Sequence, residues 1–126
     1  RDILQYDQTV EDSTARLAGT DRTCDLLFGV GDGKEGKFRG YQYSYSVLNV
    51  FDDKNLQPYN ETWHQRIDNT VYWGMDWLCP NFDVVLQDQL KLWWGNVTAE
   101  NTIQYILPAL QTGSTHVAVY DLGKQY

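Results

Sequence analysis

Residues 41–50 read YQYSYSVLNV and carry the clearest period of two in the chain. Three tyrosines at every second position, followed by Val47, share one face of an extended backbone, and smaller polar residues share the other face as far as Leu48. Successive side chains of a strand point to opposite faces of a sheet. The alternation therefore predicts a half-buried strand over 41–50.

Upstream of this run, residues 23–30 contain the apolar stretch Leu26-Leu27-Phe28 and lead into a glycine-rich segment over 29–36. Four glycines in eight positions remove side-chain restraint, so we expect a strand that enters a long loop. The segment does not match the Walker phosphate loop, because Phe28 stands where that pattern needs Gly and Glu35 where it needs Ser or Thr. Residues 1–20 are polar and weakly patterned, and 13–17 predict at most a short edge strand.

Downstream, residues 51–69 lack either periodicity and predict an exposed excursion between strands. Pro80 and Asn81 mark the start of a helix that ends at Gly95, and Thr98 is the expected N-cap of a second helix that Pro108 kinks or shortens. Residues 115–122 alternate like a strand and precede a turn signal with no return strand. The order of strands, loop, two helices and a strand predicts an α+β fold with helices packed on an antiparallel sheet.

Length and charge limit the classes of protein to consider. The chain has 126 residues, which is enough for a single domain or for a fragment of a larger processed domain. Its formal net charge is -7. Its ten Lys and Arg residues are scattered, which argues against binding to nucleic acid. No apolar run approaches the roughly 20 residues that a transmembrane helix needs, so no transmembrane segment is expected. With neither a signal-peptide core nor an initiator Met at its start, the chain is expected to be a processed product or part of its gene product.

Two N-glycosylation acceptors, Asn60 in Asn60-Glu61-Thr62 and Asn96 in Asn96-Val97-Thr98, predict N-linked glycans on a secreted, extracellular or lysosomal protein. The two cysteines, Cys24 and Cys79, are expected to form one disulfide, which fits an oxidising compartment. The alternative is a pair of free buried thiols.

No complete catalytic site and no cofactor or metal site is expected from the sequence. His64 and His116 are not paired in any metal-binding spacing, and the group of Asp52, Asp53 and Asn55 lacks the Gly and Glu of a calcium-binding EF-hand loop. The tryptophans at 73, 77, 93 and 94 favour core packing over a stacking platform for ligands.

The last third of the chain resembles a known enzyme family. Residues 93–103 (WWGNVTAENTI) and 111–122 (QTGSTHVAVYDL) are similar to the C-terminal part of secreted and lysosomal N-terminal-nucleophile (Ntn) amidases, in particular the acyl-CoA:isopenicillin N acyltransferase group and the acid-ceramidase-like proteins. The resemblance covers about 50 residues from Val71 onward. It implies an αββα sandwich and an enzyme that hydrolyses or forms linear amide bonds with a cysteine exposed by autoproteolysis.

The chain departs from that family at the nucleophile. It begins with Arg1, and neither Cys24 nor Cys79 can be a terminal nucleophile, so the catalytic residues are unknown and the nucleophile is expected in another chain or in another segment of the same precursor. The leading hypothesis is a segment of a secreted or lysosomal Ntn-type amidase or N-acyltransferase relative that acts on linear amide bonds, and it includes a member that is inactive as this chain and has kept only the fold. The alternative is a noncatalytic extracellular glycoprotein module that provides structural or adhesive contacts in an assembly.

Overall fold

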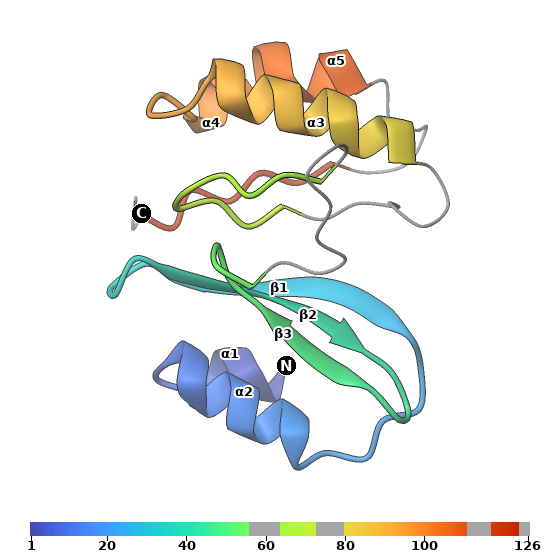
Figure 1. The fold of residues 1–126 in the computed structure, drawn as a ribbon. Helices are drawn as coiled ribbons and strands as arrows, with labels where there is room; N and C mark the ends of the chain where they lie inside the picture. Colours follow the sequence, from blue (N-terminus) through green and yellow to red (C-terminus); the bar gives the residue numbers. More distant parts are fainter. Residues whose placement is uncertain (56–63, 73–79, 111–116, 124–126) are drawn as a thin grey trace.

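The chain folds as an α+β structure in successive layers (Figure 1). The computed structural model describes residues 1–55, 64–72, 80–110 and 117–123, except for the side chains of residues 80–83. Two helices lie on one side of the sheet. On the other side, under a layer of further helices, lie the segment 64–72, which reverses direction at Asp68-Asn69, and the extended segment 117–122. The elements are α1 (Asp2–Tyr6), α2 (Val10–Ala18), β1 (Leu26–Asp32), β2 (Lys37–Tyr43), β3 (Leu48–Phe51), α3 (Pro80–Leu92), α4 (Ala99–Asn101), the π-helical turn η1 (Thr102–Ile106) and α5 (Leu107–Leu110).

The three strands form an antiparallel sheet in the order β1-β2-β3, which confirms the predicted α+β class with an antiparallel sheet. The single strand expected over 41–50 is wrong, because the chain reverses inside it. The Ser44 amide donates to the Val47 carbonyl (2.8 Å), and Tyr43 pairs with Leu48 across the hairpin. A turn made of Ser-Tyr-Ser-Val keeps the period of two of the strands around it, so the alternation hides the reversal.

Strand β1 has glycines, and so no side chains, on the face that turns away from α2. The prediction of a long loop over 29–36 is wrong in its first half, because β1 continues to Asp32. Gly29 and Gly31 belong to β1, paired with Gly40 and Phe38 of β2. The Phe38 ring lies over Gly29, where a Cβ would come within 2.1 Å of it, and Leu122 covers Gly31, where a Cβ would come within 2.2 Å of its Cδ1. Here the missing side chains allow close packing, and the turn itself is confined to residues 33–36.

The first 20 residues are helical, and the edge strand expected over 13–17 is wrong. Thr9 accepts a hydrogen bond from the Asp12 amide (3.1 Å), and the Asp12 carboxylate accepts one from the Thr9 amide (3.1 Å), which forms a capping box at the start of α2. The buried side chains of α2 are Val10, Ser13 and Leu17. Helix α2 is also tied to the sheet by a hydrogen bond of 2.7 Å between the hydroxyls of Thr14 and Tyr41.

The opposite face of the sheet is joined to α3 by an apolar core. Phe51 of β3 packs with Ile67 and Tyr72 of the extended segment, and the partly buried Leu86 and Leu90 of α3 pack against this group. All three central residues are buried, so the side chains of Ile67 and Tyr72 fill the space between the sheet and the helix.

Both predicted helices are present. Helix α3 begins at Pro80 as expected and extends to Leu92, shortly before Gly95. The Thr98 hydroxyl accepts from the Asn101 amide (3.1 Å) and caps α4, as predicted. Ahead of Pro108 the helix widens into η1, where the Leu107 amide donates to the Thr102 carbonyl five residues back. Proline has no amide hydrogen and its ring crowds the preceding turn, which accounts for the irregularity there.

The strand expected over 115–122 is not formed in its described part, since residues 117–121 carry no strand assignment. Residues 115 and 116 lie outside the part that the structure describes. None of the helices among the described residues has the length and apolar character needed to cross a membrane.

We predict that Gly33→Ala destabilises the fold by about 1–3 kcal/mol, because the new Cβ would overpack the segment that crosses β1. A Cβ at Gly33 would lie 2.0 Å from the Leu122 carbonyl oxygen, which belongs to the backbone and cannot move aside as a side chain would. The free energy of unfolding from urea denaturation measures the effect.

The matched control is Gly19→Ala, where the added Cβ would meet the Ala15 carbonyl oxygen at an ordinary contact distance of 3.5 Å. Equal free energies of unfolding for the two variants would show that residue 122 does not lie over the turn.

Candidate functional site

The predicted glycosylation acceptor Asn96 lies in the exposed turn between α3 and α4. Its amide donates to the Trp93 carbonyl (2.8 Å), and its own carbonyl accepts from the side chain of Asn101 (2.9 Å). These bonds hold the backbone and leave the Asn96 side chain exposed. The other acceptor, Asn60, lies outside the described residues.

Cys24 is exposed in the connection between α2 and β1. Its expected disulfide partner, Cys79, falls in a part of the chain that the structure does not describe. The disulfide between them therefore stays a prediction.

The residues weighed as metal ligands have structural contacts. His64 is fully buried and stacks on Tyr72 with ring centroids 4.5 Å apart, while His116 is outside the described residues. Asp52 accepts from the amides of Lys54 (2.8 Å) and Asn55 (3.0 Å), which closes a local turn. Among the described residues, no group of three or more His, Cys, Asp or Glu side chains could hold a metal ion.

The two described tryptophans differ in their surroundings. Trp93 is half-buried and stacks on Tyr105 of η1 at 4.9 Å, which fits the core packing that was predicted. Trp94 is 56% exposed, and its indole nitrogen donates to the Asp68 carbonyl (3.0 Å). Trp73 and Trp77 lie outside the described part of the chain.

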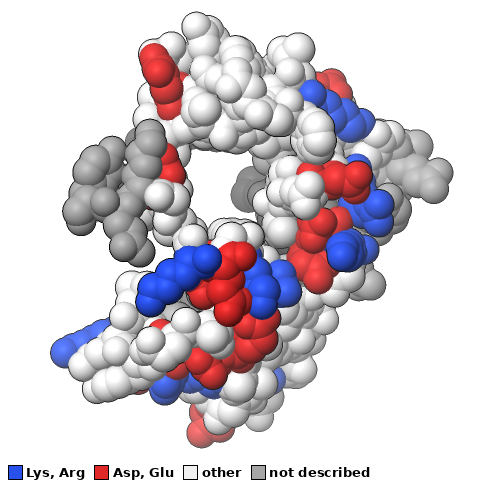
Figure 2. All heavy atoms as spheres, turned by 90° about the vertical axis from the view of Figure 1, so that its left-hand side faces the viewer, with Lys and Arg blue, Asp and Glu red and all other residues white. Residues whose placement is uncertain are grey.

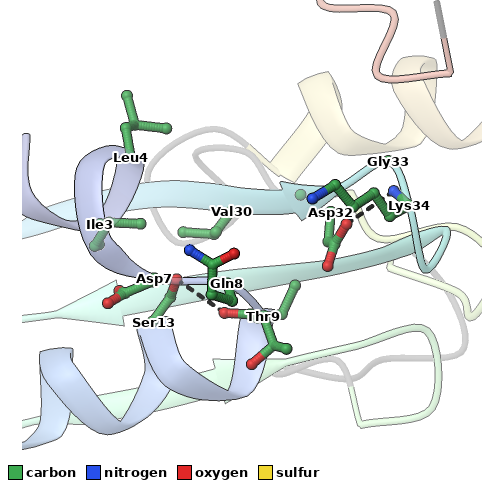
Figure 3. A pocket seen from close by; sticks show the side chains of 12 residues that line it. Ile3, Leu4, Asp7, Gln8, Thr9, Ser13, Val30, Asp32, Gly33 and Lys34 are labelled. Carbon is green, nitrogen blue, oxygen red and sulfur yellow. Dashed lines mark hydrogen bonds between the residues drawn. The ribbon is translucent and has the colours of Figure 1, made fainter. Parts of the chain in front are cut away.

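A small pocket of about 220 Å³ lies between the two N-terminal helices and the end of β1. Figure 3 shows Ile3 and Val30 at its apolar side, Asp7 and Ser13 beside them, and Asp32 and Lys34 at the glycine turn. Most of the polar groups already have structural partners. The Ser13 hydroxyl donates to the Thr9 carbonyl (3.3 Å), and Asp32 accepts from the Lys34 amide (2.8 Å).

The strongest charge interaction at this pocket joins Asp7 and Arg16. The guanidinium donates to Oδ1 of Asp7 from Nε (2.8 Å) and from Nη2 (2.5 Å), and the Asp7 side chain is only 4% exposed. These hydrogen bonds hold the pKa of Asp7 below its ordinary value of 3.8, against the opposing effect of desolvation. The pair fixes the approach of α1 to α2, and its position indicates a structural role.

A larger opening of about 1030 Å³ separates the sheet from the outer helices. Figure 2 shows it as a hollow beside clustered charged side chains. Its walls combine the apolar residues Val71, Leu90, Val97 and Val119 with the charged residues Lys37, Arg39, Asp53 and Asp121. Lys37 is paired with Glu35 (2.7 Å) and Glu11 (3.4 Å), which raises its pKa, first through Glu35.

The opening was not foreseen from the sequence. It brings together residues from the hairpin, the extended segments and the helical turn that are up to 86 positions apart, between Gly36 and Leu122. The alternation of residues 115–122 was the one signal that pointed to this region, through the unpaired strand that it predicted.

Two proteins of Dictyostelium discoideum are similar to the chain over almost its whole length. Protein dcd1A is 29% identical over an alignment of 124 positions, which covers 96% of this chain and 28% of the relative. Protein dcd1B is 32% identical over an alignment of 126 positions, which covers 96% of this chain and 24% of the relative. The chain thus spans about a quarter of the length of these relatives. No family model matches the chain, and no solved structure matches it.

We predict that Asp7→Asn lowers stability at neutral pH and that its cost disappears in acid. Because the pKa of Asp7 is lower in the folded chain than its ordinary value of 3.8, the ionised carboxylate stabilises the fold above that pH. The contribution is lost as the pH falls through the folded value. Melting temperatures of the wild type and the variant between pH 7 and pH 2 check this, and they should converge at the acid end.

Asp21→Asn is the control, since Asp21 is exposed and has no hydrogen bond to another residue of the described chain. A difference between wild type and Asp7→Asn that does not change with pH would contradict the role given to the ionised carboxylate.

Proposed function

We propose that the chain is part of a secreted or lysosomal relative of the Ntn amidases and N-acyltransferases, which act on linear amide bonds. The observation that carries the proposal is the order of layers. Helices α1 and α2, the antiparallel sheet, the extended segments and the outer helices follow one another (Figure 1). This succession suits an αββα sandwich in which the second sheet is represented here by the segments 64–72 and 117–122.

The placement of the family-like residues supports the proposal. Residues 93–103 follow the end of α3 at Leu92 and run through a turn and α4 into the start of η1. The described part of 111–122 runs back between that helical layer and the sheet. In that position a strand would be covered on one side by helices and on the other by the first sheet, as the central layers of a sandwich are.

In this proposal the nucleophile lies outside the chain. Cys24 and Cys79 are internal, and a thiol acts as an Ntn nucleophile only at a newly formed N-terminus. Activity then requires another chain or another segment of the same precursor. The lengths of the two Dictyostelium relatives, about four times that of the aligned region, are compatible with such a segment.

The second candidate is a noncatalytic extracellular glycoprotein module. It is favoured by the apolar side chains that the described surface leaves exposed, among them Leu92 (73%), Trp94 (56%) and Tyr120 (80%). Large exposed aromatic residues are enriched at the cores of protein interfaces. This function needs an assembly partner and no nucleophile.

The enzyme proposal is tested with protein expressed from the complete gene. A fluorogenic N-acyl amide should be hydrolysed, and alkylation of thiols should abolish the hydrolysis because the thiolate is the attacking group. N-terminal sequencing of the processed chains should then find a cysteine at a junction. An intact, unprocessed protein without hydrolysis would contradict the proposal and favour the noncatalytic module.

We predict that Asn96 carries an N-linked glycan when the protein passes through a secretory pathway. Glycosidase treatment should lower the mass of the peptide that contains Asn96, and Asn96→Gln should remove this shift. Thr98→Ser keeps both the acceptor motif and a capping hydroxyl, so it should retain the glycan, whereas Thr98→Ala should lose it. An unchanged mass after glycosidase treatment of the wild type would refute the use of this site.

A further inference from the structure

Residues 117–120 are an extended stretch of backbone without a partner. They run between the sheet and the outer helices (Figure 1), and no strand pairing or hydrogen bond joins them to any other described residue. Their side chains are also uncovered, with Val117 58% and Tyr120 80% exposed. A sequence rich in Val and Tyr has a high preference for strands, so this stretch presents a free strand edge.

One end of the stretch is fixed in place. Leu122 packs on Gly31, and its carbonyl oxygen lies directly over Gly33, at the positions where β1 has no side chains. The contact anchors the segment against the sheet and sets its direction. The free edge is therefore held at a defined place beside the opening.

The opening next to this edge is too large for a packed interior. Its volume is about 1030 Å³, and Val119, Tyr120, Asp121 and Leu122 form part of its wall. Protein interiors are close-packed and contain few voids larger than a water molecule. Apolar walls at Val71 and Leu90 would gain from an occupant that covers them.

We propose that residues 117–120 receive a β-strand from another segment of the same precursor, which pairs with this edge and fills the opening with its alternate side chains. The inference rests on the proposed function, because it assumes the longer polypeptide that supplies the nucleophile. Backbone hydrogen bonds would give the added strand its affinity, and side chains at every second position its specificity.

The charged residues that line the opening limit which side chains the incoming strand can carry. Arg39 lines the opening, and its guanidinium donates to the Phe38 carbonyl (2.9 Å). It forms no salt bridge among the described residues, although it lies near enough to Glu11 for an attractive charge interaction. Lys37, by contrast, is already paired with two glutamates. Because the wall carries both cationic and acidic groups, the strand is expected to direct apolar side chains toward Val71 and Leu90 and polar side chains toward Arg39 and Asp53.

A second copy of this chain fits the edge less well. A pair of edges formed by residues 117–122 of two copies would leave the opening empty behind each of them. Stable interfaces between separate proteins also bury about 1,200 Å² or more, which a few paired residues do not supply. A segment of the same polypeptide avoids much of the entropy cost of association.

The test is photo-crosslinking in protein expressed from the complete gene. Tyr120→p-benzoylphenylalanine places the probe on the free edge, and mass spectrometry should find it joined to a peptide of the same polypeptide outside residues 1–126. The matched control is Tyr45→p-benzoylphenylalanine, because Tyr45 has nearly the same exposure (82%) and lies in the β2–β3 turn. The control should not join to that peptide.

A crosslink inside residues 1–126, a crosslink between two copies, or none at position 120 would overturn the inference. Hydrogen exchange of the unsubstituted protein gives a second measurement. The amides of residues 117–120 should exchange as slowly as those of the β1–β2 ladder, and exchange as fast as at the exposed Tyr45 turn would also overturn it.

The experiments can reject the added strand and the enzymatic activity independently of each other. A crosslink to an outside peptide without amide hydrolysis supports the strand and rejects the enzyme. Hydrolysis that is sensitive to alkylation, but without that crosslink, supports the enzyme and rejects the strand.

Discussion

The contact on which the structure depends is the packing of Phe51, Ile67 and Tyr72 between the sheet and α3. Phe51 is the last residue of β3 and stands opposite Gly40, so its ring extends from the face that turns away from α2. Without Ile67 and Tyr72 above it, that face would have no apolar cover from the outer helices. Burial of three such side chains contributes several kcal/mol, at roughly 1.5–3 kcal/mol for each, and it fixes the distance between the two layers.

That distance also explains why the opening forms. The core occupies one part of the space between sheet and helices, and the opening occupies another part, between the β1–β2 hairpin, the segment 117–122 and the helical layer. Phe38 and Leu122 cover the glycines of β1, and both also line the opening together with Leu90 and Val97. The layers are therefore held apart by large residues at one place and left unfilled at another, which is the geometry that the proposed strand would complete.

The helix boundaries that were predicted correctly depend on residues close together in the sequence. Pro80 at a helix start and Thr98 as an N-cap are present in the structure, because capping depends on residues a few positions apart. The capping box of Thr9 and Asp12 was equally readable and was missed, since the weak periodicity of the first 20 residues suggested a strand. Three features could not be predicted from the spacing of residues in the sequence, because each depends on which residues meet in the folded chain. They are the reversal inside 41–50, the ion pair of Asp7 and Arg16, and the opening. The glycosylation acceptors and the disulfide remain predictions, and of their four residues the structure describes only Asn96 and Cys24.

Thr98 belongs both to the glycosylation acceptor sequence and to the N-terminal cap of α4, so the timing of helix formation matters for modification of Asn96. The same hydroxyl completes the acceptor sequence for Asn96 and accepts the Asn101 amide at the start of α4. Once the helix forms, that hydroxyl is committed and the backbone of the acceptor is held by bonds to Trp93 and Asn101. In a chain that is glycosylated at Asn96 as predicted, glycan transfer and helix formation would therefore compete kinetically, and the fraction of chains modified would depend on how slowly this turn closes after synthesis.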